Sequence, residues 1–181
     1  MKIMIFLFAG LIAIAWNQHA KTYPTSREKF NDSAEKAAIL NTIENEIDCF
    51  YKRDYESWKE NFVQEEYTFL GGNNPNGTFD ATISWPEVDK KSGSYIKENP
   101  VEPGKGSPPW IERKNMLIKF FSESLAYIIW DQYNGDETNR TFLLSKEQRM
   151  MVKINRKWKI ANVSTYRDYK NIFPVDSIYN F

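Results

Sequence analysis

Four long runs of β-branched and aromatic residues in the second half of the chain constrain its fold more than any other feature. They occupy residues 111–121, 125–134, 141–154 and 157–166, and segments rich in Ser, Gly, Asp, Glu and Asn separate them. This composition and these short connections are typical of consecutive antiparallel strands. Because helical patterns come first and the strands follow, we predict an α+β fold in which about three N-terminal helices pack on the concave face of one curled antiparallel sheet.

The first helix is predicted to begin at Asp32, because Glu35 follows three residues later in a capping-box pattern. Apolar residues then recur at three- and four-residue steps, as expected for a helix with one buried face: Leu40, Ile43, Ile47 and Phe50. A second, short helix is predicted from Asp54 to about Phe62, and a third, irregular one over 84–98. Between them we expect a short strand at 66–70 and a turn cluster at 71–77.

The composition excludes several classes of function. The 181 residues carry 24 Lys and Arg against 24 Asp and Glu, which argues against a nucleic-acid-binding surface. Cys49 is the single cysteine and His19 the single histidine, so an internal disulfide, a cysteine metal cage and the histidine-based catalytic triads are excluded. No phosphate-binding loop or spaced metal-ligand motif is present, so we expect neither a metal nor a cofactor.

The first twenty residues resemble a signal peptide. Lys2 precedes the apolar run 3–15, which is shorter than the roughly 20 residues needed to span a bilayer, and small and polar residues follow. An uncleaved N-terminal anchor is the alternative. We therefore predict a secreted or periplasmic protein with no membrane attachment after cleavage, a mobile lead-in at 21–31, one domain at 32–170 and a tail at 171–181.

The last two strands predict a cavity. If Asn155 and Arg156 form a two-residue turn, Arg149 lies opposite Asn162 and Glu147 opposite Ser164. Because side chains alternate between faces, one face then carries both apolar and polar groups: Glu147, Arg149, Met151, Trp158, Ile160, Asn162, Ser164 and Tyr166. An apolar floor with a few converging polar groups is typical of a small-molecule pocket.

Arg149 has three interpretations at this stage. It pairs with Glu147 at the edge of the sheet, it binds a ligand carboxylate, for which a guanidinium is well shaped, or it takes part in catalysis. A register shift of one residue would move the whole set to the opposite face.

Several segments resemble a known family. Residues 125–128 (LAYI), 132–133 (QY), 147–150 (EQRM) and 157–163 (KWKIANV) are most similar to the end of the association domain of calcium/calmodulin-dependent protein kinase II. They also resemble the wider nuclear transport factor 2-like superfamily, which includes SnoaL-like and ketosteroid isomerase-like domains. The resemblance implies a conical half-barrel with a pocket between sheet and helices, and a homodimer. It matches Arg149 to a pocket-facing arginine.

The same resemblance bears on catalysis. Asn162 and Ser164 stand where relatives often carry two histidines. The catalytic carboxylate and the helix-one tyrosine of steroid isomerases fall at about Leu70 and Glu46, which do not match them. A fold of this kind hosts enzymes, binding modules and scaffolds alike.

Three functions follow from these observations. The preferred one is an exported SnoaL-like domain that binds a small, largely apolar molecule, with any anionic end held by Arg149. Its predicted ligand-binding residues are Arg149, Asn162, Ser164, Glu147, Trp158 and Tyr127. The second is a cofactor-independent isomerase, cyclase or dehydratase that uses Asp131 or Tyr166 with Arg149. The third is a dimerisation scaffold.

Overall fold

The computed structural model describes residues 31–101, 110–136 and 138–180. The predicted signal peptide at 1–20 and most of the predicted lead-in lie outside these ranges. In the described ranges, no helix is both long and apolar enough to cross a membrane.

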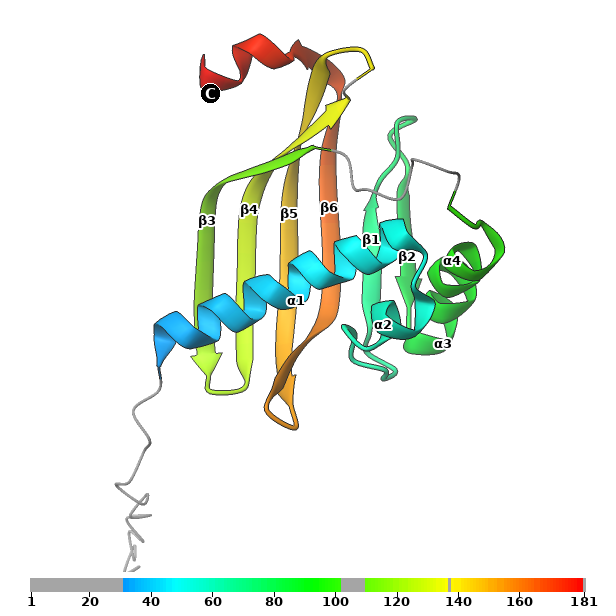
Figure 1. The fold of residues 1–181 in the computed structure, drawn as a ribbon, viewed down its shortest axis with the longest axis vertical. Helices are drawn as coiled ribbons and strands as arrows, with labels where there is room; N and C mark the ends of the chain where they lie inside the picture. Colours follow the sequence, from blue (N-terminus) through cyan, green and yellow to red (C-terminus); the bar gives the residue numbers. More distant parts are fainter. Residues whose placement is uncertain (1–30, 102–109, 137, 181) are drawn as a thin grey trace, which may run out of the picture. The chain divides into compact units, whose positions relative to one another are not determined.

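One six-stranded sheet forms the body of the fold, with the strand order β2-β1-β6-β5-β4-β3 (Figure 1). The last four strands confirm the predicted antiparallel meander: β3 (Ile111–Ser122), β4 (Leu125–Asp136), β5 (Thr141–Ile154) and β6 (Lys157–Pro174). β1 (Phe69–Asn73) and β2 (Phe79–Ile83) form a hairpin, and β1 pairs with β6 in parallel. The sheet is therefore mixed, where we expected a purely antiparallel one.

The hairpin β1–β2 occupies most of the segment that we predicted as a turn cluster. Gly71 and Gly72 belong to β1, and the turn itself begins after Asn73. A Cβ atom on Gly72 would lie 2.5 Å from the backbone oxygen of Thr165, so the parallel pairing of β1 with β6 needs a residue without a side chain there. The sequence pattern predicts a turn at these glycines, whereas in the structure Gly72 permits close approach of two backbones.

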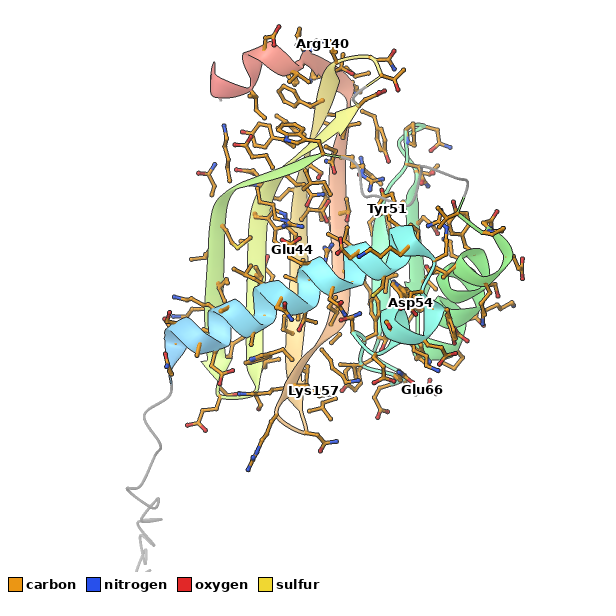
Figure 2. The ribbon with its side chains drawn as sticks, viewed as in Figure 1. Glu44, Tyr51, Asp54, Glu66, Arg140 and Lys157 are labelled. Atoms are coloured by element: carbon orange, nitrogen blue, oxygen red, sulfur yellow. The ribbon has the colours of Figure 1, made fainter. Side chains whose placement is uncertain are left out.

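Helix α1 (Asp32–Lys52) crosses β3 to β6 on one face of the sheet (Figure 1). Its N-cap is Asn31, one residue before the predicted start, and the Asn31 side chain accepts a hydrogen bond of 3.2 Å from the Ala34 amide. The helix ends at Arg53, which adopts a left-handed conformation. Asp54, which is labelled in Figure 2, then caps α2 (Tyr55–Lys59).

The remaining helical segment confirms the predicted irregular helix. It consists of α3 (Trp85–Val88), a π-helical turn at Asp89–Gly93 and α4 (Ser94–Glu98), and it lies beside β1 and β2 (Figure 1). Trp85 packs against α2 and the residues after it, with ring centres 5.9 Å from Trp58 and 6.0 Å from Phe62. These aromatic contacts join the short helices to the main core.

The main core lies between the helices and the inner face of the sheet. It includes Ile43 of α1, Trp58 of α2, Ile128 of β4 and Ile160 of β6, all of them buried. The curled sheet and the helices on its inner face confirm the predicted α+β half-barrel.

A second apolar cluster lies at the C-terminal end of the chain. β6 continues to Pro174, and a 3₁₀ helix follows at Val175–Asn180. Ile178 packs with Tyr133 and Phe142, and its carbonyl accepts a hydrogen bond of 3.0 Å from Lys114. Contacts with the sheet thus extend into the segment that we expected to be a tail.

The N-terminal half of α1 is attached to the last hairpin through Glu35. Its two carboxylate oxygens accept hydrogen bonds of 2.6 Å each, from Lys153 Nζ and from the indole nitrogen of Trp158. Lys153 lowers the pKa of Glu35 below its ordinary value of 4.5.

We predict that Glu35→Gln destabilises the protein at neutral pH and has less effect in acid. Because the pKa of Glu35 is depressed on folding, its contribution is complete above pH 4.5 and is lost as pH falls through the lower, folded value. Urea denaturation of both proteins between pH 3 and pH 8 measures this. Glu66→Gln, at an exposed loop position (Figure 2), is the control. A stability difference that does not change with pH would contradict the role of the carboxylate charge.

Candidate functional site

A β-bulge in the last hairpin decides which residues face the interior. The pairing follows the prediction from Ile154–Lys157 to Met151–Ile160, and then Met150 lies opposite Asn162. Ala161 is therefore the extra residue of a bulge. Beyond it, Arg149 lies opposite Val163 and Glu147 opposite Thr165, one residue further along β6 than predicted.

Because of the bulge, three residues of β6 lie on the face opposite to the predicted one. Asn162, Ser164 and Tyr166 lie opposite Met150, Gln148 and Lys146, on the outer face of the sheet. The prediction that they share a face with Arg149 and Glu147 is wrong, because it assumed unbroken alternation through Ala161. Ile160 and Ala161 are consecutive buried residues, a pattern that strict alternation does not produce.

Tyr127 also lies outside the interior. It is opposite Met150 in the β4–β5 pairing, and its buried neighbours Ala126 and Ile128 face the helices instead. Trp158 does face the interior and is buried, but its indole nitrogen is bonded to Glu35 near the hairpin end. Neither residue is therefore part of the polar group around Arg149.

Asp131 and Tyr166, the predicted acid–base candidates, lie together on the outer face. Both are cross-strand neighbours of Lys146, and all three line an open hollow of about 300 Å³. Asp131 accepts hydrogen bonds from Lys146 and, at 2.7 Å, from Asn115, and the Lys146 bond lowers the pKa of its carboxyl. The predicted partnership of Asp131 or Tyr166 with Arg149 is wrong, because the sheet separates them from it.

Arg149 and Glu147 form a buried ion pair on the inner face of β5. Arg149 is 6% exposed and Glu147 2% exposed, and Nη1 of Arg149 lies 3.0 Å from Oε2 of Glu147. β5 is flanked by β4 and β6, so the pair lies within the sheet. The predicted ion pair exists, but not at the sheet edge where we placed it. Arg149 faces inward, as the cavity hypothesis requires.

A chain of hydrogen bonds leads to Glu147 across the inner face. Trp130 Nε1 donates to Gln132 at 3.1 Å, and Gln132 Nε2 donates to Asn134 at 2.8 Å. Asn134 donates to Ser145 Oγ at 3.0 Å, and Ser145 Oγ donates to Glu147 Oε1 at 2.9 Å. Such a connected network satisfies the buried polar groups along its length.

The aromatic face of Trp130 lies within cation–π distance of two guanidinium groups. The Cζ atom of Arg149 is 5.1 Å from the ring centre, and that of Arg113 is 5.8 Å away. Arg113 also pairs with Glu44 of α1, which Figure 2 labels. The Nε atoms of Arg113 and Arg149 are buried and have no hydrogen-bond partner in the described structure. Both arginines therefore retain a free donor beside Trp130.

Glu46 of α1 faces the same region from the helix side. One of its oxygens accepts a hydrogen bond of 3.2 Å from Trp58 Nε1. Burial raises the pKa of Glu46 above its ordinary value, the charge of Glu147 acts in the same direction, and Arg149 and Arg113 oppose the rise. Glu46 nevertheless retains some solvent-accessible surface.

We call Glu46, Arg113, Glu147 and Arg149 the inner charged cluster. Sequence reasoning missed Glu46 as a site residue, although one signal was available. Glu46 lies three residues after Ile43 and four before Phe50, so it continues the buried stripe of α1. A carboxylate on the buried face of a helix is a candidate functional group. Burying it without a partner is costly, so its presence there needs an explanation.

An open hollow shares one residue, Thr165, with the surroundings of the inner charged cluster. It measures about 250 Å³ and is lined by residues of β1, β2, β6 and the π-helical turn, among them Gly72, Thr165 and Arg167. The hydroxyl of Thr165 donates to Glu147 Oε2 at 2.7 Å. Thr165 thus lines the hollow and also contacts the ion pair. Burial raises the pKa of Tyr51 of α1, which Figure 2 labels, and the positive charge of Arg167 acts in the opposite direction.

The described ranges contain no cluster of side chains suited to binding a metal ion. No group of three or more His, Cys, Asp or Glu side chains there is arranged to hold a metal ion.

Comparison with solved structures identifies the fold. An NTF-2-like protein of unknown function from Shewanella oneidensis MR-1 matches with a TM-score of 0.52 and 17% identity, over 73% of this chain and 98% of that one. A putative scytalone dehydratase from Novosphingobium aromaticivorans DSM 12444 matches with a TM-score of 0.51 and 16% identity, over 75% and 85%. A ketosteroid isomerase-like protein from Erwinia carotovora atroseptica SCRI1043 matches with a TM-score of 0.50 and 15% identity, over 74% and 95%.

The chain therefore has the nuclear transport factor 2-like fold, as the sequence resemblance implied. No protein-family model matches the chain, and comparison with curated protein sequences finds no significant match. At these identities the structural similarity establishes the fold and leaves the activity open.

We predict that Thr165→Val destabilises the protein by about 1–2 kcal/mol, because it removes one of the donors to the buried Glu147 carboxylate. Ser164→Ala, on the outer face, is the matched control and should cost less than about 0.5 kcal/mol. Urea denaturation at pH 7 measures both. The reverse order of the two effects would show that Ser164, and not Thr165, faces Glu147, as the unbulged register requires.

Proposed function

We propose that this chain is an exported binding domain with the nuclear transport factor 2-like fold, which takes a small, largely apolar molecule between α1 and the inner face of the sheet. In this proposal the anionic end of the molecule binds Arg149. The hollow beside Thr165 gives access, and Trp130 and the apolar core provide the surface for the rest of the ligand.

The observation that carries the proposal is the unpartnered Nε of Arg149. Leaving a buried charged donor without an acceptor costs about 1–3 kcal/mol or more, so such groups are uncommon where no ligand binds. The guanidinium is fixed in place by Glu147, by the carbonyl of Gln148 at 2.9 Å and by the ring of Trp130. It is thus preorganised, and a carboxylate oxygen is the acceptor that fits it best.

Two further features belong to the proposal. Export is supported by the short apolar run at 3–15. A homodimer is supported by exposed apolar side chains on β3, Leu117 and Phe121, because an exposed apolar patch marks an interaction surface. N-terminal sequencing of the mature protein tests the first, and light scattering tests the second. An uncleaved chain or a monomer would contradict them.

We predict that protein purified from its native host retains a small molecule through Arg149. Native mass spectrometry should show the bound mass in the wild type, and Arg149→Lys should reduce its occupancy. Lysine keeps the positive charge beside Glu147 but has no Nε donor, so we expect at least about tenfold weaker binding.

Lys119→Ala, an exposed position on β3, is the control and should retain the molecule like the wild type. No bound molecule in the wild type, or equal retention by Arg149→Lys, would contradict the proposed function.

A further inference from the structure

We propose that the outer face of the sheet carries a second binding site, which takes a neutral saccharide at the hollow lined by Asp131, Lys146 and Tyr166. We call this open hollow of about 300 Å³ the outer hollow. The three residues lie on the outer face, whereas Arg149 and Glu147 are buried on the inner one. The inference therefore does not depend on the ligand proposed for Arg149.

The outer hollow forms where the pairing of β5 with β6 is interrupted. Leu144 is the single residue of β5 that stands opposite four residues of β6, 168–171. The extra residues of β6 make a second bulge in this strand, separate from the one at Ala161. Bulges of this kind recur beside functional sites, because they redirect side chains and open the surface of a sheet.

The Asp168 side chain closes this second bulge and also lines the outer hollow. Its carboxylate accepts hydrogen bonds from the backbone amides of Lys170 and Asn171, at 3.1 Å and 3.3 Å, and from Asn171 Nδ2 at 2.7 Å. Three donors thus hold the bulged segment in one conformation. The hollow is a fixed concavity of the sheet.

A chain of side chains from three strands fixes the polar groups of the outer hollow. Asn115, which has a left-handed conformation (φ 53°) at an irregularity of β3, donates to Asp131 of β4 at 2.7 Å. The other oxygen of Asp131 accepts a hydrogen bond from Lys146 of β5. An acceptor and a group with three N–H donors are therefore held side by side. Neighbouring hydroxyls of a sugar both donate and accept, so they fit such a pair.

Exposed aromatic rings continue the surface at one side of the outer hollow. Tyr166, which lines the hollow, is 46% exposed, and Phe79 of β2 is 54% exposed. Their ring centres are 6.5 Å apart and their planes are inclined by 28°. The C–H-rich face of a pyranose ring is apolar and packs on aromatic rings of this kind. Adjoining exposed rings beside converging polar groups mark an interaction surface.

The charges of the outer hollow select an uncharged ligand. Hydrogen bonds from Lys146 and from Asn171 lower the pKa values of Asp131 and Asp168, so both carboxyls are ionised at neutral pH. Two carboxylates and the one ammonium of Lys146 leave a net charge of −1 at the hollow. This charge disfavours an anion, and the ammonium group disfavours a cation in contact with it. A polyhydroxylated neutral molecule avoids both penalties.

The experiment titrates neutral saccharides into the ¹⁵N-labelled protein. The probes are maltose, cellobiose, xylobiose, galactose and N-acetylglucosamine, each to about 50 mM, because a shallow site with few contacts gives a millimolar Kd. At least one of them should shift the backbone amide signals of Lys146 and Tyr166 in a saturable way.

Variants of Tyr166 separate the aromatic contact from other effects. Tyr166→Ala should weaken the binding about tenfold, because it removes the ring on which the sugar packs, whereas Tyr166→Phe should keep the Kd within about threefold. Asp131→Asn should also weaken binding, since it removes the charge that orients Lys146. The matched control is Tyr67→Ala, at a tyrosine that is 57% exposed and does not line the outer hollow, and it should bind like the wild type.

The outcomes that overturn the proposal are distinct. They are the absence of saturable shifts at Lys146 and Tyr166 with all five saccharides, and equal binding by Tyr166→Ala. Choline or glucuronate that shifts the same signals at a lower Kd than every neutral probe overturns the choice of an uncharged ligand. A wild-type dimer that Tyr166→Ala converts to a monomer in light scattering assigns the surface to a second copy of the chain instead. None of these results bears on the ligand proposed for Arg149, so the two proposals fail separately.

Discussion

The buried ion pair of Arg149 and Glu147 is the interaction on which the interior of this protein depends. Charged groups in an apolar core are costly without partners. Here Ser145 and Thr165 donate to Glu147, and Arg149 contacts the ring of Trp130 while its Nε has no partner in the described structure. These partners come from three neighbouring strands. The pair therefore links β4, β5 and β6 on the inner face of the sheet.

The bulge at Ala161 determines which side chains of β6 meet that pair. It lets Ile160 and Ala161 both remain buried and brings Thr165, and not Ser164, opposite Glu147. The same shift places Tyr166 beside Lys146 and Asp131 on the outer face. A single extra residue thus decides which polar side chains of β6 face the inner charged cluster and which face the outer hollow.

The fold could be predicted from the sequence, but the site only in part. The long strands, the stripe of α1 and the inward position of Arg149 follow from periodicity, because side-chain alternation holds wherever pairing is regular. The bulge broke that regularity, and the faces of Asn162, Ser164 and Tyr166 were predicted wrongly as a result. Glu46 was missed because its partners, Trp58 and Arg149, are distant in sequence and only the packing of α1 brings them together.

A double-mutant cycle on Arg149→Met and Glu147→Gln tests the central claim most directly. If the two groups are buried partners, each single variant leaves a buried polar or charged group without its partner and loses about 3–5 kcal/mol of unfolding free energy. The double variant should then lose much less than the sum of the two. Single losses within about 0.5 kcal/mol that simply add would contradict the account, because that is the behaviour of independent, solvated surface residues.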